Sequence, residues 1–151
     1  MRAAGPTRQE ETRSWRLDDG FADLAVLRQE LRSFLAAAAA SDGVTADVVL
    51  SVQEAAKNAL RAGSGAAVTV RVWIDGDSLW ISVKDRGKGL APRRLTRCPS
   101  PWSTHGRGLC LMGALMDEVR IERAHGTRLI MRRALSAGHR RPSGQLPSLV
   151  A

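Results

Sequence analysis

The hydrophobic pattern of this chain changes once, near its middle, and that change limits the folds that the chain can adopt. Between residues 21 and 62, apolar side chains recur at every third or fourth position, which is the spacing of one face of an α-helix. Between residues 68 and 83 they alternate with polar side chains, which is the spacing of a strand with one buried face. A helical half followed by a strand-rich half predicts an α+β fold, in which helices cover a sheet.

The helical half is predicted to form two helices. The first begins at Phe21 and ends in a run of alanines at Ala40. Ser41-Asp42-Gly43 should break it, with Gly43 as the terminating residue, because glycine readily takes the conformation that closes a helix. The second helix should begin directly afterwards, with Thr45 as its capping residue, and should end near residue 62.

The strand-rich half adds hairpins and one more helix. Five segments have strand character, the first of them as a short edge strand: 14–17, 68–74, 79–83, 119–123 and 127–135. Asp75-Gly76-Asp77 and Ala124-His125-Gly126 are predicted hairpin turns, and residues 106–117 are a predicted helix. The expected architecture is a two-layer α/β sandwich, with a mixed, mostly antiparallel sheet covered on one face by about three helices.

Length and composition predict a single domain. The chain has 151 residues, of which 44% are hydrophobic and 25% charged, and this balance excludes a wholly disordered protein. Neither an apolar run of about 20 residues nor a signal peptide is present, so we expect a cytoplasmic protein without a membrane span. The domain should span residues 14–135, between disordered tails at residues 1–13 and 136–151.

The chain is basic, with 23 Lys and Arg residues against 15 Asp and Glu and a net charge of +8. This charge suits nucleic acid, an acidic partner or a phosphorylated ligand, but an arginine-rich and alanine-rich composition also follows from a genome rich in G and C. Because no nucleic-acid motif accompanies the charge and only 4% of residues are aromatic, direct nucleic-acid binding is not predicted. Two cysteines, Cys98 and Cys110, are too few for a disulfide scaffold and match no metal spacing, and Cys98 is a candidate exposed thiol.

Four segments carry residues suited to chemistry, and the first is VQEAAKNALRAG at residues 52–63. Glu54 and Asn58 lie four residues apart, so their side chains project from the same face of the predicted helix. A carboxylate beside an amide oxygen suits a general base next to a hard cation such as Mg²⁺. Taken alone, the pair is more typical of a solvated helix face.

The second segment, VKDRGKGL at residues 83–90, follows the end of a predicted strand. Asp85 is placed there to accept a hydrogen bond from an amino group such as that of adenine. Gly87 and Gly89 allow a sharp turn and a close approach of the backbone to a ligand. An ordinary Asp-Gly turn is the alternative.

The third and fourth segments lie in the last part of the chain. HGRGLCLMGALMDEV at residues 105–119 opens a helix with Gly106 and Gly108, and a glycine-rich helix start presents free backbone N–H groups to phosphate oxygens. GTRLIMRR at residues 126–133 places Thr127 at a hairpin turn, where its hydroxyl can bond a ligand. Each of these features is also common in ordinary turns and helix starts.

Together, in this order and at these spacings, the four segments resemble the ATP-binding domain shared by histidine kinases, gyrase-type ATPases and Hsp90 chaperones, known as the Bergerat fold. The similarity is greatest to the small bacterial anti-sigma-factor serine kinases, and it extends from about Trp15 to Ala134. HGRGLCLMGALMDEV is closer to that subfamily than to the histidine kinases.

The resemblance implies roles for the matched residues around bound Mg-ATP. Asn58 would hold Mg²⁺ and the phosphates, and Glu54 would act as the base or orient the attacking hydroxyl. Asp85 would bind the adenine amino group, supported by Thr127 through water. Gly87 and Gly89 would hinge a lid at about residues 90–105, a segment that is rich in arginine. Gly106, Arg107 and Gly108 would contact the phosphates.

The resemblance also implies a function. The chain would be a protein serine/threonine kinase that phosphorylates an anti-sigma-factor antagonist and otherwise sequesters a sigma factor, and a homodimer remains open. One position departs from the subfamily, which commonly has histidine where this chain has Ala62. Because alanine cannot replace the hydrogen bonds of histidine, an alternative is a nucleotide-responsive regulator that binds a partner without transferring phosphate.

Overall fold

The computed structural model describes residues 11–63, 66–86, 107–123, 125–136 and 148–150. Its elements follow in this order: β1 (Thr12–Leu17), the short 3₁₀ helix η1 (Gly20–Ala22), α1 (Asp23–Ala37), α2 (Asp42–Ala62), β2 (Val68–Asp75), β3 (Ser78–Asp85), α3 (Arg107–Leu115), β4 (Glu118–Arg123), β5 (Thr127–Ala134) and β6 (Ser148–Val150).

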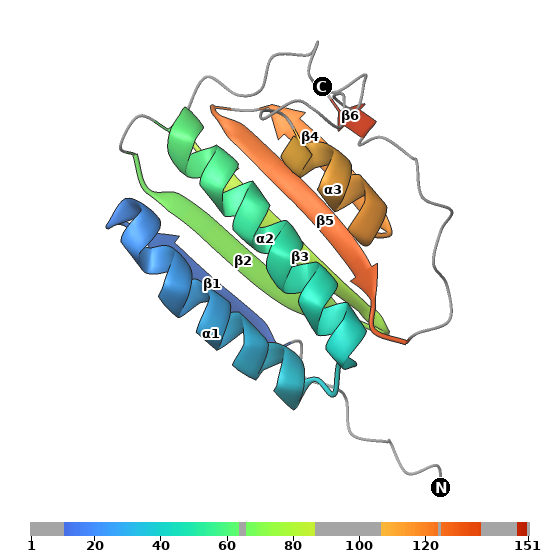
Figure 1. The fold of residues 1–151 in the computed structure, drawn as a ribbon. Helices are drawn as coiled ribbons and strands as arrows, with labels where there is room; N and C mark the ends of the chain where they lie inside the picture. Colours follow the sequence, from blue (N-terminus) through green and yellow to red (C-terminus); the bar gives the residue numbers. More distant parts are fainter. Residues whose placement is uncertain (1–10, 64–65, 87–106, 124, 137–147, 151) are drawn as a thin grey trace, which may run out of the picture.

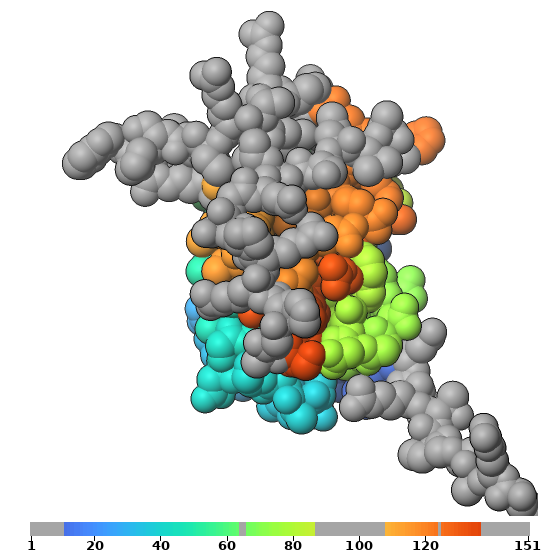
Figure 2. Space-filling model, turned by 90° about the vertical axis from the view of Figure 1, so that its right-hand side faces the viewer, coloured from blue at the N-terminus to red at the C-terminus, as the bar shows by residue number. Residues whose placement is uncertain are grey.

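The strands form one sheet in the order β1-β2-β3-β5-β4-β6. Every neighbouring pair is antiparallel except β4 and β6, which are parallel. Helices α1, α2 and α3 lie on one face of this sheet (Figure 1). Figure 2 shows the two layers from the side, with α1 and α2 in blue to cyan on the left and β2 and β3 in yellow-green on the right. The predicted α+β two-layer sandwich with a mixed, mostly antiparallel sheet is therefore confirmed.

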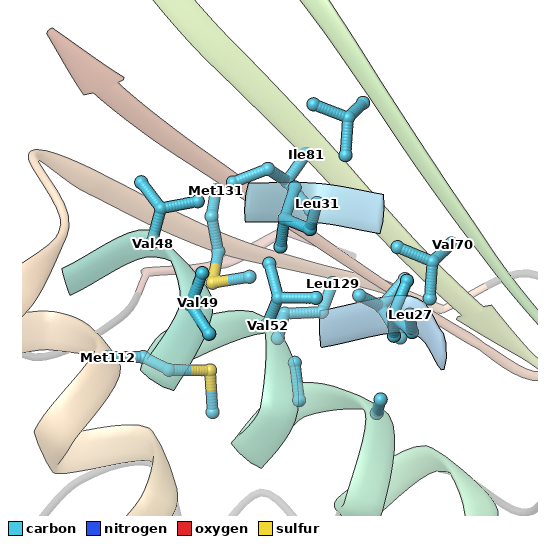
Figure 3. Close-up of a cluster of buried hydrophobic side chains, with 14 of the residues drawn as sticks. Leu27, Leu31, Val48, Val49, Val52, Val70, Ile81, Met112, Leu129 and Met131 are labelled. Carbon is cyan, nitrogen blue, oxygen red and sulfur yellow. The ribbon is translucent and has the colours of Figure 1, made fainter. Parts of the chain in front are cut away.

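The hydrophobic core lies between these layers and explains why the two periodicities coexist. Helix α2 buries its valine-rich face against inward-facing strand residues such as Ile81 and Met131, and Leu31 of α1 and Met112 of α3 extend the contact at either side (Figure 3). Val52, Ile81, Met112 and Met131 are each fully buried. Because successive strand residues point to opposite faces, only alternate residues of β2, β3 and β5 reach this core.

The boundary between the first two helices differs from the prediction. Ser41 is the residue that caps α2, since its Oγ accepts a hydrogen bond from the backbone N–H of Val44 at 3.2 Å. Gly43 therefore lies inside the first turn of α2 and terminates nothing, and Thr45 is not the cap. Helix α1 ends at Ala37, and Ala39 takes the left-handed conformation (φ 56°) that had been expected of a glycine.

Both predicted tails contain residues of a strand. Strand β1 begins at Thr12, inside the segment 1–13, and pairs with β2 over its full length. Ser148–Val150 forms β6 inside the segment 136–151 and pairs with β4. Short strands of this kind span too few residues to show a clear alternation of apolar and polar side chains. Their position is set by pairing with a neighbouring strand.

Candidate functional site

A pocket opens between helices α2 and α3 and the ends of β3 and β5. Its apolar lining comes from all four elements: Ala55, Ala59, Ala62, Val83, Leu109, Met112 and Leu129. Three polar residues also line it: Asn58, Asp85 and Thr127. A concave, mostly apolar surface with a few convergent polar groups is the usual form of a small-molecule site.

Asp85 and Thr127 form the polar part of the sheet side of this pocket. They are register partners, because Asp85 ends β3 and Thr127 begins the adjacent antiparallel strand β5. Both are buried, with only 5% and 6% of their surface exposed. The Oγ1 atom of Thr127 has no hydrogen-bond partner among the described residues. Since a buried hydroxyl normally has a partner, this atom is suited to a ligand or a water molecule.

Gly126, predicted only as part of a turn, allows the backbone before Thr127 to approach Asp85 closely. Its φ of +113° lies in a region that other residues rarely adopt. A Cβ atom at this position would lie 2.8 Å from the Cα of Arg86 and closer still to the carbonyl oxygen of Asp85. The Gly-Thr pair at the start of a strand is the signal that could have identified this requirement.

Glu54 and Asn58 lie one turn apart on α2, and both face the start of α3. A Cβ atom built on Gly108 would lie 3.1 Å from Nδ2 of Asn58 and 3.4 Å from Oε2 of Glu54. Glycine at this position therefore lets α3 approach the two side chains more closely than a larger residue would. Glu54, Asn58 and Gly108 are three of the predicted site residues, and they lie close together between α2 and α3.

Lys57 is a further functional candidate, which was not among the predicted site residues. Its Nζ atom lies 3.0 Å from Oε1 of Glu54, and both side chains are partly buried. The carboxylate of Glu54 thus has one oxygen on an ammonium group and the other directed toward Gly108. The spacing of three residues between Glu54 and Lys57 on a helix is the signal for this pair.

Ala62 also lines the pocket, one turn after Asn58 on α2. The position at which this chain departs from the anti-sigma-factor kinases therefore faces the site. A methyl group there adds apolar surface and provides no hydrogen bond.

The other predicted site residues cannot be placed. Gly87, Gly89, Gly106 and the lid at residues 90–105, with Cys98, lie outside the described residues. Arg107 begins α3, but its side chain is not among those described. Cys110, in α3, is disulfide-bonded. Within the described ranges, no cluster of three His, Cys, Asp or Glu side chains is arranged to hold a metal ion, and no helix is long and apolar enough to span a membrane.

The pocket has one polar end at Asp85 and Thr127 and another at Asn58. Together with the fold, it defines a nucleotide-binding domain of the Bergerat type. The chain belongs to the histidine kinase-like ATPase domain family, whose model matches residues 20–133. Membership implies an ATP-binding site. The four-segment resemblance stated above is thereby confirmed.

Among the solved structures that are similar to this chain, one is similar over most of its length. It contains the RsbU and RsbW domains of Rv1364c from Mycobacterium tuberculosis, with a TM-score of 0.65 and 26% sequence identity. The similarity covers 86% of this chain and 34% of that chain, so the present chain spans about a third of the length of the chain that it matches. No curated protein matches this chain closely enough to be considered a relative.

Replacing Gly108 by alanine should weaken nucleotide binding without destabilising the fold. The new methyl group would displace the Asn58 side chain by a few tenths of an ångström, while alanine stabilises a helix by up to about 1 kcal/mol relative to glycine. Gly43→Ala is the matched control, because Gly43 is also helical but a Cβ there meets nothing within 4 Å. Urea unfolding and calorimetric titration with ATP measure the two effects. Equal ATP affinity in both variants would show that the contact between Gly108 and Asn58 does not shape the site.

Proposed function

We propose that this protein is an ATP-dependent serine/threonine kinase of the anti-sigma-factor type, which phosphorylates a serine of an anti-sigma-factor antagonist and sequesters a sigma factor. The observation that carries the proposal is the convergence of Glu54, Asn58 and Gly108 beside a pocket whose other end holds Asp85 and Thr127. The likeness to a structure that includes an RsbW domain favours this subfamily within the ATPase family.

The residues of the pocket fit a nucleotide. The carboxylate of Asp85 would accept a hydrogen bond from the adenine amino group, and the unpartnered Thr127 hydroxyl would bond the base through water. The apolar lining would cover the faces of the base and exclude bulk water. These contacts would position the nucleotide with its phosphates toward Asn58 and the N-terminus of α3, where backbone N–H groups favour anions.

Asn58 would hold Mg²⁺ through its amide oxygen. In phosphoryl-transfer sites this cation is commonly bound by one or two protein oxygens together with the substrate phosphates, so a single amide oxygen fits the role. When bound, Mg²⁺ would neutralise charge on the phosphates. The side-chain amide of Asn58 is packed against Gly108, and this contact would fix its orientation.

Glu54 would act on the serine hydroxyl of the substrate protein. Its carboxylate would accept the hydroxyl proton, or would orient the hydroxyl, as the serine oxygen attacks the γ-phosphorus of ATP. The bond between that phosphorus and the β,γ-bridging oxygen would break, and ADP would leave. The ammonium group of Lys57 holds one carboxylate oxygen, which leaves the other for the substrate. Phosphoryl transfer relies mainly on positioning, so the fixed carboxylate is well suited to this step.

A second candidate function is favoured by Ala62. The subfamily commonly has histidine at this pocket-lining position, and alanine removes a polar group beside Asn58. In this alternative, ATP binding changes the affinity for a partner protein and no phosphate is transferred. A cytoplasmic location accompanies both proposals, a homodimer remains open in both, and neither proposal involves nucleic acid or a membrane.

Incubation with labelled ATP, Mg²⁺ and candidate antagonist proteins from the same genome distinguishes the two functions. For a kinase we expect label on a serine of one antagonist, and loss of that label in the Asn58→Ala variant. Ala62→His should be assayed in parallel. If the wild type binds ATP and labels no antagonist while Ala62→His labels one, the regulatory alternative is correct for this chain.

A further inference from the structure

The face of the sheet opposite the helices carries a second set of aligned side chains, which we call the open face. No helix among the described residues covers it (Figure 1). The strand register brings six basic side chains to this face: Arg16, Arg71, Lys84, Arg120, Arg128 and Arg132. Its strand positions hold three acidic side chains: Asp75, Glu118 and Glu122. The open face is therefore basic, and it is separate from the nucleotide pocket.

Two tryptophans in the middle of the open face hold three of these arginines in place. Trp73 and Trp80 are register partners, and their rings are stacked with centroids 6.2 Å apart and an interplanar angle of 10°. The guanidinium of Arg71 lies 5.7 Å from the centre of the Trp73 ring. Those of Arg120 and Arg132 lie 5.9 Å and 6.0 Å from the centre of the Trp80 ring. A guanidinium held against a ring keeps its N–H groups available for anions.

The cations of the open face differ in how far they are already neutralised. Glu118 pairs with both Arg120 and Arg132, at 2.9 Å and 3.3 Å. In contrast, Arg71 and Lys84 are exposed and have no acidic partner in the described part of the chain. They are diagonal neighbours, because Arg71 pairs with Ser82 and Thr69 pairs with Lys84. Diagonal neighbours on one face lie roughly 7–8 Å apart.

This arrangement matches the chemistry of one kind of partner. Alternate residues of an extended peptide lie about 7 Å apart on the same side, so two carboxylates at positions i and i+2 would reach both Arg71 and Lys84. A second copy of this chain would bring an equally basic face against the first. Single-stranded nucleic acid requires free ring faces for base stacking, whereas both indoles already have ring or guanidinium partners.

We propose that the open face is a docking surface for an extended acidic segment of a partner protein. This segment bears Asp or Glu at alternate positions.

The test uses a short peptide of alternating glutamate and serine as the probe. Binding should shift the indole N–H resonances of Trp73 and Trp80 in a heteronuclear spectrum. The resonance of Trp15 should not shift with them, because its indole N–H is hydrogen-bonded to Glu30 of α1 on the helical side. A peptide of the same composition with all glutamates in one block should bind more weakly, since it lacks the alternate spacing.

The double variant Arg71→Gln, Lys84→Gln should lose about tenfold in affinity for the alternating peptide. The matched control is Arg28→Gln, Arg32→Gln, which removes the same charge from the exposed side of α1 and should change the affinity less than about twofold. ATP affinity should be equal in all variants, which confirms folding and keeps this test independent of the kinase proposal.

Three outcomes would overturn the proposal. An equal loss in both double variants would mean that the peptide responds only to net charge. Tighter binding of an oligothymidylate of similar length, with the same indole shifts, would assign the face to nucleic acid. A dimer in light scattering that dissociates in the Arg71→Gln, Lys84→Gln variant would assign it to self-association.

Discussion

Replacing Glu54 by glutamine should lower the rate of phosphoryl transfer by about 10²–10⁴-fold and leave ATP affinity nearly unchanged. Glutamine keeps the size of the side chain but cannot accept a proton from the substrate hydroxyl. Glu54 does not line the pocket itself, so the nucleotide should lose few contacts. Single-turnover transfer of labelled phosphate to the antagonist, together with calorimetric titration of ATP, measures both quantities.

Two further variants separate the role of Glu54 from that of its neighbours. Asn58→Ala should reduce Mg-ATP binding as well as turnover, because Asn58 lines the pocket and would hold the cation. Lys57→Gln removes the ion pair with Glu54 while keeping the carboxylate. If Lys57→Gln slows transfer as much as Glu54→Gln does, the ion pair and not the base is what the reaction requires. Transfer at the wild-type rate in Glu54→Gln would exclude Glu54 as the base.

Asp85→Asn should weaken ATP binding by about ten- to a hundred-fold. A hydrogen bond to a charged group contributes roughly 1.5–3 kcal/mol, and the amide must turn its NH₂ group away from the base to accept the same bond. Because Asp85 is 5% exposed, water cannot readily replace the lost interaction. The measurement is calorimetric titration with ATP.

The control for Asp85→Asn is Asp75→Asn, which makes the same chemical change at an exposed strand end away from the pocket. It should leave ATP affinity unchanged. Thr127→Val should weaken binding less than Asp85→Asn, since Thr127 would act through water. Wild-type ATP affinity in Asp85→Asn, with an unchanged unfolding transition, would remove base recognition from this residue.

The layered fold was predictable from the sequence because burial against a single core imposes a periodicity on each element. The hairpins around Asp75-Gly76-Asp77 and Ala124-His125-Gly126 were placed correctly, since turn residues interrupt that periodicity. The junction at Ser41 and Gly43 was not, because two local signals compete there. A serine that can cap a helix and a glycine that can end one lie two residues apart, and the hydrogen bond from Val44 to Ser41 decides between them.

The candidate site was predictable as a set of residues but not as an arrangement. Glu54 and Asn58 share a helix face by spacing alone, and Asp85 and Thr127 were each assigned to an element end. Their proximity to one another depends on the pairing of β3 with β5 and on the packing of α3 against α2. These contacts join residues far apart in the chain, which local patterns do not encode.

The sequence alone therefore determined most of the elements, the layers and most of the residues suited to chemistry, because local periodicity and residue type carry that information. Only the tertiary structure decided which of those residues meet. In the folded chain Ala62 lines the pocket, and only glycine fits at residue 126 beside Asp85. On the face without helices, Trp73, Trp80 and their arginines lie side by side on neighbouring strands. These contacts depend on the strand register and on how closely α3 packs against α2. Both result from the packing of the whole chain around one core.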